Sequence, residues 1–118
     1  MGIFGKKQTN DGLNLNYKGF HILASLSKGR KHGYGIARDI WDSTDHKIDL
    51  TIASLYENID KLRNDGFIEP DGEETVNGRV RKMWKLTGKG YRAAQEYQRL
   101  INSAGLSDHA PGVGGAAI

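Results

Sequence analysis

An Asn-Gly dipeptide constrains this chain more than any other feature of its sequence. Asn77-Gly78 lies within the stretch "VNGRVRKMW", where polar and apolar side chains alternate. A two-residue type I′ turn needs φ > 0 at both central positions, which Gly adopts freely and Asn tolerates. The pattern therefore predicts a β-hairpin whose second strand covers Arg79–Leu86.

The predicted second strand and the residues after it are rich in cations. No acidic residue occurs from Thr75 to Gln95, and the segment carries these basic side chains: Arg79, Arg81, Lys82, Lys85, Lys89 and Arg92. The formal net charge is only +3, so the distribution of charge says more than its total. A basic stripe on one side of a domain is typical of a phosphate-binding surface, although a solvated basic face without a partner remains open.

Length and composition limit the class of protein. A chain of 118 residues fits one domain with one hydrophobic core. It has no cysteine, which excludes disulfides, thiolate metal sites and cysteine nucleophiles and fits a reducing compartment. No apolar run approaches the roughly 18 residues of a membrane span, and the N-terminus lacks a signal-peptide core. We expect a cytoplasmic protein with no membrane contact.

Helical spacing of apolar residues predicts four helices. The first begins at Asn14 or Asn16 and ends before Gly29, and the second covers roughly residues 33–41. The third covers residues 51–65, with Thr51 suited to the N-cap and with this buried stripe: Ile52, Leu55, Ile59 and Leu62. The fourth is capped by Thr87 and extends to about Ala104. A short strand over "GFIEP", ending at Pro70, precedes the hairpin turn.

The resulting order is three helices, two strands and a helix. This mainly α (α+β) arrangement predicts a winged helix-turn-helix, in which the basic hairpin is the wing. We expect a flexible arm over residues 1–13, the winged domain over 14–86, a C-terminal dimerisation helix over 87–104 and a disordered Gly/Ala-rich tail over 105–118.

In a helix-turn-helix, the N-terminal residues of the second helix of the motif meet base edges in the major groove. Thr51 and Ser54 are therefore candidates for contacts to bases or phosphates, and Lys61 for a phosphate contact. Glu57 has two interpretations: it accepts from cytosine N4, or it pairs with Lys61 one helical turn later.

Aromatic and basic residues are the candidates for contacts to the DNA backbone. Tyr56 and Tyr34 each have two interpretations, a hydroxyl that reaches a phosphate or a ring that belongs to the core. Arg79, Arg81 and Lys82 are the predicted phosphate contacts of the wing, which position a protein without reading sequence.

These segments resemble one family in unbroken order. "HILASLSKGRKHGYGIARDI" (His21–Ile40) resembles the first helix and the His-Gly-Tyr-x-Ile segment of the PadR family of bacterial transcriptional regulators. "LTIASLYENIDKLRNDGFIEP" (Leu50–Pro70) is similar to its recognition helix, and "GRVRKMWKLTGKGYRA" (Gly78–Ala93) to its wing and following helix. Departures are Ile52-Ala53 in place of Pro-Gly and Arg63 in place of Glu.

The resemblance implies a dimeric winged-helix repressor that binds double-stranded DNA at a pseudo-palindromic operator. It matches Thr51, Ser54, Tyr56 and Lys61 to the family's recognition helix, Arg81-Lys82 to its wing and Tyr34 to its His-Gly-Tyr motif. It also implies that the fourth helix packs against a partner's first helix and that a small aromatic effector releases DNA in some members. The expected dimer residues are Tyr17, Phe20, Tyr91, Ala94, Tyr97 and Ile101, and an aromatic core is the alternative role for these rings.

Other classes of function find less support. The sequence has four histidines but no H-E-x-x-H, no G-x-S-x-G and no phosphate loop, so we expect neither an enzyme nor a metal or cofactor site. A winged helix used for non-specific nucleic-acid binding or for protein contact remains the alternative, because a fold does not settle a function.

Overall fold

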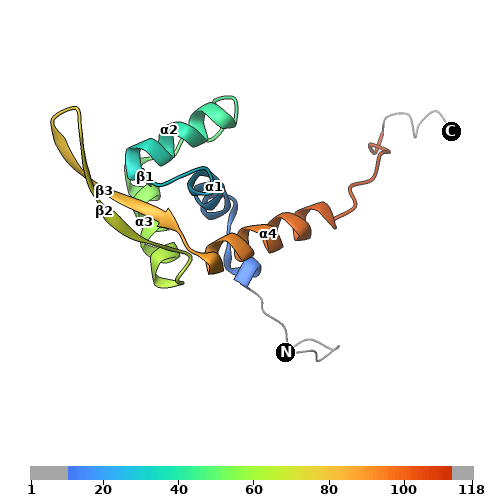
Figure 1. Cartoon of the computed structure of the whole chain (residues 1–118). Coiled ribbons are helices and arrows are strands. Elements are labelled where there is room, and N and C mark those ends of the chain that lie inside the picture. The colour runs from blue at the N-terminus through green and yellow to red at the C-terminus, as the bar shows by residue number, and fades with distance from the viewer. Residues whose placement is uncertain (1–10, 113–118) are drawn as a thin grey trace.

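The computed structural model describes residues 11–112 of the chain, and in it the helices and a small sheet surround one core (Figure 1). The elements follow the chain in this order: η1 (Asp11–Asn14, a 3-10 turn), α1 (Tyr17–Leu26), β1 (Lys31–His32), α2 (Gly33–Ser43), α3 (Ile52–Asn64), β2 (Ile68–Val76), β3 (Arg79–Leu86) and α4 (Gly88–Asn102). The predicted winged helix-turn-helix is confirmed.

Short polar residues begin three of the four α-helices in the described part of the chain, α1, α3 and α4. Asn16 accepts from the N–H of Gly19, Thr51 from that of Ser54 and Thr87 from that of Gly90. Each of these residues has extended backbone, and its side-chain oxygen satisfies an N–H that has no partner within the helix. The predicted caps Thr51 and Thr87 are confirmed, and Asn16 is the N-cap of α1.

The hairpin turn is the predicted one. Asn77 has φ 53° and Gly78 has φ 77°, and Val76 pairs with Arg79 across the turn. The first strand, however, is longer than expected, because it continues past Pro70 to Val76. Pro70 is tolerated because β2 is an edge strand, and an irregularity between Pro70 and Glu73, where Gly72 has φ 73°, lets the pairing resume.

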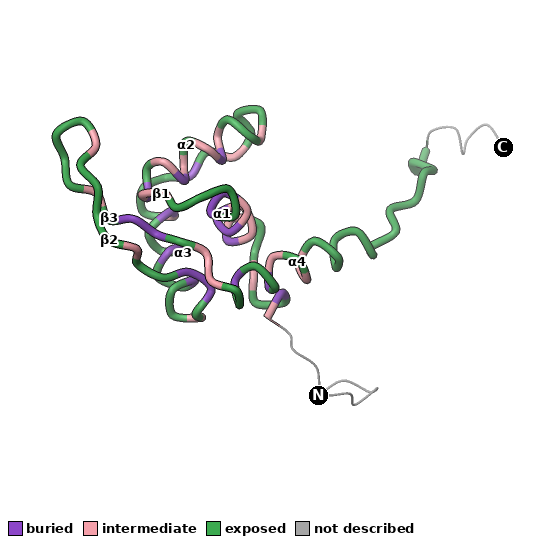
Figure 2. The backbone as a smooth tube through the Cα atoms, viewed as in Figure 1, coloured by how far each residue is buried: buried purple, intermediate pink, exposed green. Residues whose placement is uncertain are grey.

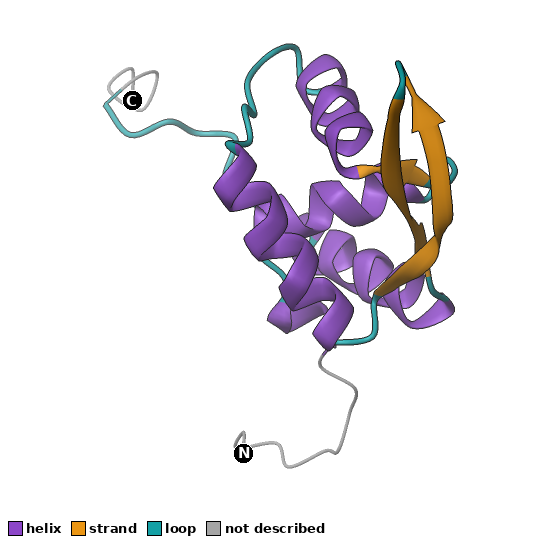
Figure 3. Ribbon diagram, turned by 90° about the vertical axis from the view of Figure 1, so that its left-hand side faces the viewer, coloured by secondary structure: helices purple, strands orange, loops and turns teal. Residues whose placement is uncertain are grey.

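The sheet has a third, very short strand, which was not among the predicted elements. Lys31 pairs with Trp84 and His32 with Met83, so the antiparallel order is β1-β3-β2. At the base of the sheet, β3 is therefore the central strand. β1 pairs with β3 and is followed directly by the start of α2. Figure 3 shows the sheet along one side of the helices.

The core fills the space between the first three helices and the base of the sheet. It comprises Ile22, Leu23, Leu26, Ile36, Ile40, Leu50, Leu55, Ile59, Leu62, Phe67, Ile68, Trp84 and Ala93. Figure 2 shows burial concentrated there, whereas the outer hairpin and the second half of α4 are exposed. Those two projections are thus free of the core.

The start of α4 packs closely against the turn between α3 and β2. The hydroxyl of Thr87 donates to the carbonyl of Gly66 at 2.7 Å, and its N–H donates to the carbonyl of Phe67 at 3.1 Å. A Cβ at Gly90 would stand 2.1 Å from the Phe67 carbonyl oxygen, so only glycine fits there. This contact sets the direction in which α4 leaves the domain.

Part of the predicted flexible N-terminal arm has regular structure. Residues 11–13 belong to η1, because the N–H of Gly12 donates to the carboxylate of Glu96 on α4 at 2.7 Å. Residues 1–10 of the predicted arm and residues 113–118 of the predicted tail lie outside the described residues. Residues 105–112 form no helix or strand and are exposed.

Candidate nucleic-acid interface

α3 has one buried and one exposed face. Leu55, Ile59 and Leu62 are buried as predicted, and Asn58 joins them with its amide donating to the carbonyl of Ser54 at 2.8 Å. Ile52 was predicted to complete this stripe, but 77% of its surface is exposed. The prediction was wrong because helical periodicity assigns Ile52 to the core face, although no element covers that face at the first turn. The exposed residues over the first three turns are Ile52, Ala53, Tyr56, Glu57, Asp60 and Lys61.

Tyr56 of α3 meets the beginning of α2. Its hydroxyl lies over Gly33, where a Cβ would approach to 2.8 Å. The ring of Tyr34 is 61% exposed, and it lies parallel to the His32 ring with 6.5 Å between the centroids. The N-terminal end of α2 is therefore flanked by two phenols, each with its ring partly on the protein and partly in solvent.

A groove separates α2 from the first turn of α3. It has a volume of about 450 Å³, and its lining residues are Tyr34, Ala37, Arg38, Trp41, Asp49, Leu50, Ile52 and Leu55. The floor is mostly apolar, and Arg38 and Asp49 supply charge. The groove brings the predicted contact Tyr34 to the same edge as the start of α3.

Two lysines, one on α1 and one on α3, make side-chain contacts at α3 that the sequence did not predict. The ammonium of Lys18 on α1 donates to the hydroxyl of Ser54 at 3.0 Å, which places a cation beside the first turns of α3. Lys61, a predicted phosphate contact, instead lies between the carbonyl of Asn14 at 3.2 Å and the carboxylate of Asp65 at 3.1 Å. A phosphate contact by Lys61 would require it to leave both partners.

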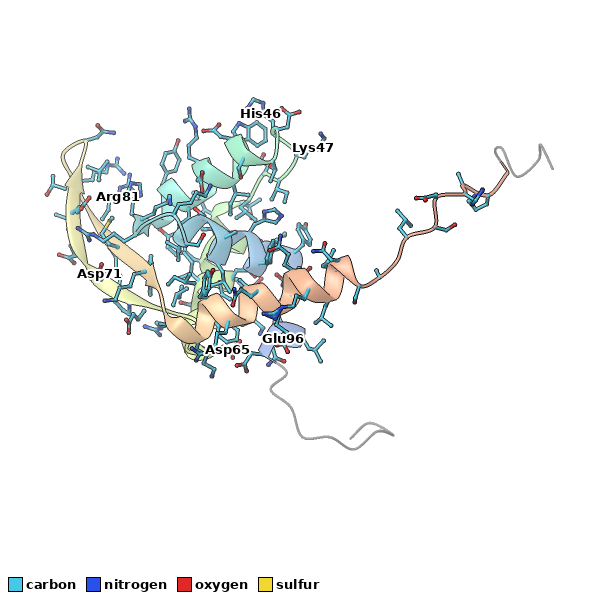
Figure 4. All side chains as sticks on the ribbon, turned by 45° about the vertical axis from the view of Figure 1, so that its right-hand side comes forward. His46, Lys47, Asp65, Asp71, Arg81 and Glu96 are labelled. Carbon is cyan, nitrogen blue, oxygen red and sulfur yellow. The ribbon has the colours of Figure 1, made fainter. Side chains whose placement is uncertain are left out.

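The hairpin is not uniformly basic, because acidic side chains of β2 stand opposite basic side chains of β3. Across the strands, Glu73 stands opposite Lys82 and Glu74 opposite Arg81, and Lys85 pairs with Glu69 at 3.6 Å. The acidic residues of β2 beyond Pro70 are Asp71, Glu73 and Glu74, and the expected end of the strand at Pro70 had excluded them from the sheet. Figure 4 shows Asp71 and Arg81 on the hairpin, whereas Glu96 lies on α4. The cationic stripe of the sequence is thus largely compensated by its neighbouring strand.

Arg30 competes for the acids of β2 from the far edge of the sheet. Its guanidinium donates to the carbonyl of Asp71 at 2.9 Å and pairs with the carboxylate of Glu74. Since Arg30 precedes β1 and its partners lie in β2, its side chain crosses the outer face of β3. It ties the base of the wing to the helical body.

The three predicted wing cations have different surroundings. Arg79 is exposed beside the turn and stands opposite Val76, which carries no charge. Lys82 lies over the ring of Trp84, 5.0 Å from its centroid. Arg81 is partly buried, and its Nε has no hydrogen-bond partner. Arg79 is therefore the wing cation that is most available to an anionic partner.

A charged cluster holds α2 against the end of α1. Lys28 pairs with Asp39 at 2.9 Å, and the ammonium of Lys31 donates to the carbonyl of Ser25 at 2.6 Å. Burial raises the pKa of the Asp39 carboxyl, but the hydrogen bond from Lys28 and the charges of Lys28 and Lys31 lower it more, so its pKa lies below the ordinary value. Burial lowers the pKa of Lys31.

The six predicted dimer residues lie along one seam between α1 and α4. Phe20 and Tyr97 stack with their ring centroids 4.9 Å apart. Two adjoining depressions, of about 200 and 280 Å³, follow the seam, and Phe20 and Gln98 line both. The other predicted residues at these depressions are Tyr17, Tyr91, Ala94, Tyr97 and Ile101. Burial lowers the pKa of His21 at the same seam.

The described residues also bear on metal binding and on membrane spanning. Between residues 11 and 112, no group of three or more His, Asp or Glu side chains could hold a metal ion. Within the same range, no helix combines the length and apolar character of a membrane-crossing segment.

Comparison with solved structures identifies the fold. A transcriptional regulator from Clostridium thermocellum has a TM-score of 0.67 and 21% identity, over 75% of this chain and 86% of that one. Bacillus subtilis PadR in complex with operator DNA has a TM-score of 0.65 and 20% identity, over 86% of this chain and 58% of PadR. RosR of H. salinarum has a TM-score of 0.59 and 23% identity, over 81% of this chain and 82% of RosR.

Comparison of sequences identifies the family. None of the curated proteins matches the chain. The model of the transcriptional regulator PadR-like family matches residues 22–96, which include α2, α3, the hairpin and the first half of α4. The match confirms the resemblance drawn from the three sequence motifs. The chain therefore belongs to the PadR-like family of transcriptional regulators and is not an enzyme.

Proposed function

We propose that this protein is a homodimeric transcriptional repressor that acts in the cytoplasm on a pseudo-palindromic operator. Two copies of α3 enter successive major grooves about one helical turn apart, and the wings contact the flanking backbone. A small aromatic molecule releases the DNA.

The exposed N-terminal face of α3 carries this proposal. The first turn of α3 is not covered by any other described element, which a purely structural role for the helix does not require. This turn is flanked by the two phenols at the start of α2. Bacillus subtilis PadR, which shares the fold, forms a complex with operator DNA. We infer that this chain meets a duplex with the exposed face of α3.

The proposed contacts are of two kinds: some read base edges, and the others bind phosphates of the DNA backbone. Thr51 and Ser54 lie at the first turn of α3, within reach of base edges. Tyr34, Tyr56, Arg79, Arg81 and Lys82 serve phosphates, with Arg79 the most available of the wing cations. To these we add Lys18, because its ammonium lies beside Ser54. Lys61 remains a candidate only if it exchanges its contacts to Asn14 and Asp65 for a phosphate.

Dimerisation uses the seam between α1 and α4. Half or more of the surface of Tyr17, Tyr91 and Ile101 is exposed in the single chain, which is much apolar area for one side of a small domain. A second copy, docking its own α1 against this α4, would bury the six residues of the seam. The aromatic effector would occupy the depressions around the Phe20–Tyr97 stack, where it could alter the angle between the two copies.

Fluorescence anisotropy tests the proposal. The full-length protein is titrated against duplex DNA from the region upstream of its own gene and against a scrambled duplex of equal length, at two salt concentrations. A hundredfold preference for the upstream DNA, about 2.7 kcal/mol, is the expected result for a regulator that controls its own expression.

Two other outcomes point to the alternative functions. Equal, salt-sensitive binding to both duplexes would indicate non-specific binding, unless duplexes selected from a random pool bind more tightly. Failure to bind any duplex would favour a module for protein contact, for which the acidic Glu57 and Asp60 on the exposed face of α3 are the supporting observation.

A further inference from the structure

Ile52 is an apolar side chain in a place where the fold does not need one. It is the first residue of α3 and is 77% exposed, while Leu55, one turn later, is buried at 3%. It is one of the residues that line the groove between α2 and α3. Replacing it by a smaller residue should therefore cost the fold little.

The charged side chains on the first turns of α3 itself do not suit an anionic partner. The charged residues among positions 51–60 are Glu57 and Asp60, both acidic and both exposed. Ala53 beside Ile52 is small and exposed, so the backbone of the first turn can come close to a surface. The available cations, Lys18 and Arg79, lie on other elements and can hold the duplex while this turn meets the bases.

The chemistry of the major groove leaves one apolar partner for such a side chain. Base edges there present hydrogen-bond donors and acceptors, and the 5-methyl group of thymine is their apolar feature. Burying a methyl group against an aliphatic side chain is favourable by about fourfold in affinity for each contact.

We propose that Ile52 is a specificity-determining residue that contacts a thymine 5-methyl group in each half-site of the operator. This inference rests on the proposed DNA-binding function and assigns a chemical preference to one position within it. Thr51 and Ser54 supply polar contacts on either side, so that the first turn of α3 reads a thymine through its methyl group rather than through a cation.

Uracil-containing DNA tests the contact, because replacing thymine by uracil removes only the methyl group. The operator is obtained from a random pool of duplexes selected with the full-length wild-type protein, and the same sequence is then made with every thymine replaced by deoxyuridine. Affinity for both duplexes is measured for the wild type, Ile52→Ala and Leu13→Ala. Leu13 is the matched control, since it is an exposed aliphatic residue in η1, and thermal unfolding confirms that each variant is folded.

The wild type and Leu13→Ala should lose about fourfold in affinity per contacted methyl on uracil DNA, and therefore on the order of tenfold for two half-sites. Ile52→Ala should bind the thymine operator more weakly and should lose little further on uracil DNA. Equal wild-type affinity for both duplexes, or a full uracil penalty in Ile52→Ala, would overturn the contact and leave DNA binding intact. Selection of no duplex at all would overturn the proposed function together with it.

Discussion

The hydroxyl of Tyr56 lies directly over Gly33, so that a single added carbon at Gly33 would approach it to 2.8 Å. This contact joins the recognition helix to the first residue of α2. Because Tyr56 is half exposed, its ring is fixed from one side only and its position depends on the missing side chain of Gly33.

Gly33→Ala should therefore lower the affinity for DNA and leave the stability of the fold nearly unchanged. The new Cβ displaces the Tyr56 hydroxyl, which weakens DNA binding by about two- to tenfold if that hydroxyl donates to a phosphate. Stability should change by less than about 1 kcal/mol, because alanine favours the helix and the tyrosine tip is free to move. Anisotropy and urea unfolding measure the two effects. In a Tyr56→Ala background the loss of affinity should disappear, and its persistence would show that Gly33 acts by another route.

Gly90→Ala should destabilise the whole domain. Its Cβ would lie 2.1 Å from the backbone carbonyl of Phe67, which cannot move without shifting β2. We expect a loss of about 2–3 kcal/mol in the free energy of unfolding, measured by urea denaturation. Gly88→Ala is the control, since its Cβ would meet only the guanidinium of Arg92 at 3.4 Å. Similar losses in both variants would contradict a specific close approach at Gly90.

Arg79→Ala should weaken binding to all duplexes and lower the magnitude of the salt slope by about one for each protomer, because an exposed cation without an opposed acid can neutralise one phosphate. Lys85→Ala should change the slope less, since Lys85 already pairs with Glu69. Arg81→Ala should fall between the two, because Arg81 stands opposite Glu74. Slopes from titrations at several salt concentrations give the order. An unchanged slope in Arg79→Ala would remove the wing tip from the phosphate contacts.

Acid should weaken the link between α1 and α2. The folded pKa of Asp39 lies below its ordinary value of 3.8, so its charged form stabilises the fold at neutral pH. That contribution is present above the unfolded pKa and is lost as the pH falls through the folded pKa. The free energy of unfolding should therefore decline below about pH 4, and Asp39→Asn should show a shallower decline from a lower neutral-pH value. Parallel curves for both proteins would assign acid sensitivity to other groups.

Tyr97→Asp should shift the solution mass toward that of a monomer. The substitution places a charge beside Phe20, in the middle of the seam proposed to bind a second copy. Light scattering after size exclusion measures the mass, and circular dichroism checks that α4 is still helical. Arg99→Asp introduces the same side chain two residues later, away from the two depressions of the seam, and should leave the mass unchanged. A dimeric mass for Tyr97→Asp would place the interface elsewhere.

Local chemistry made much of this fold predictable. The left-handed backbone of Asn77-Gly78 and the caps at Thr51 and Thr87 depend on residues only a few positions apart, and each was found where the sequence indicated. The bounds of β3 also agree with the prediction, since its alternating residues are followed at once by a capping threonine.

The errors concern contacts between segments that are distant in sequence. The exposure of Ile52 depends on what neighbouring elements fail to cover. β1 exists only because Trp84 and Met83 pair with it, and the contact of Lys18 with Ser54 spans 36 positions. The charge of the wing was overestimated for the same reason, because the acids that face Arg81 and Lys82 come from a strand that Pro70 had been expected to end.

Between Asp71 and Lys82, the outer hairpin contributes no residue to the core. Its tip is closed by a turn that requires only Asn-Gly at its two central positions. Its length is thus free to evolve separately from the rest of the chain. Two residues added to each strand would keep every side chain on its present face and would carry the tip about 7 Å farther. A family with this architecture can thus lengthen or shorten its footprint on a target by insertions and deletions in the wing, without any compensating change in the helices that keep it folded.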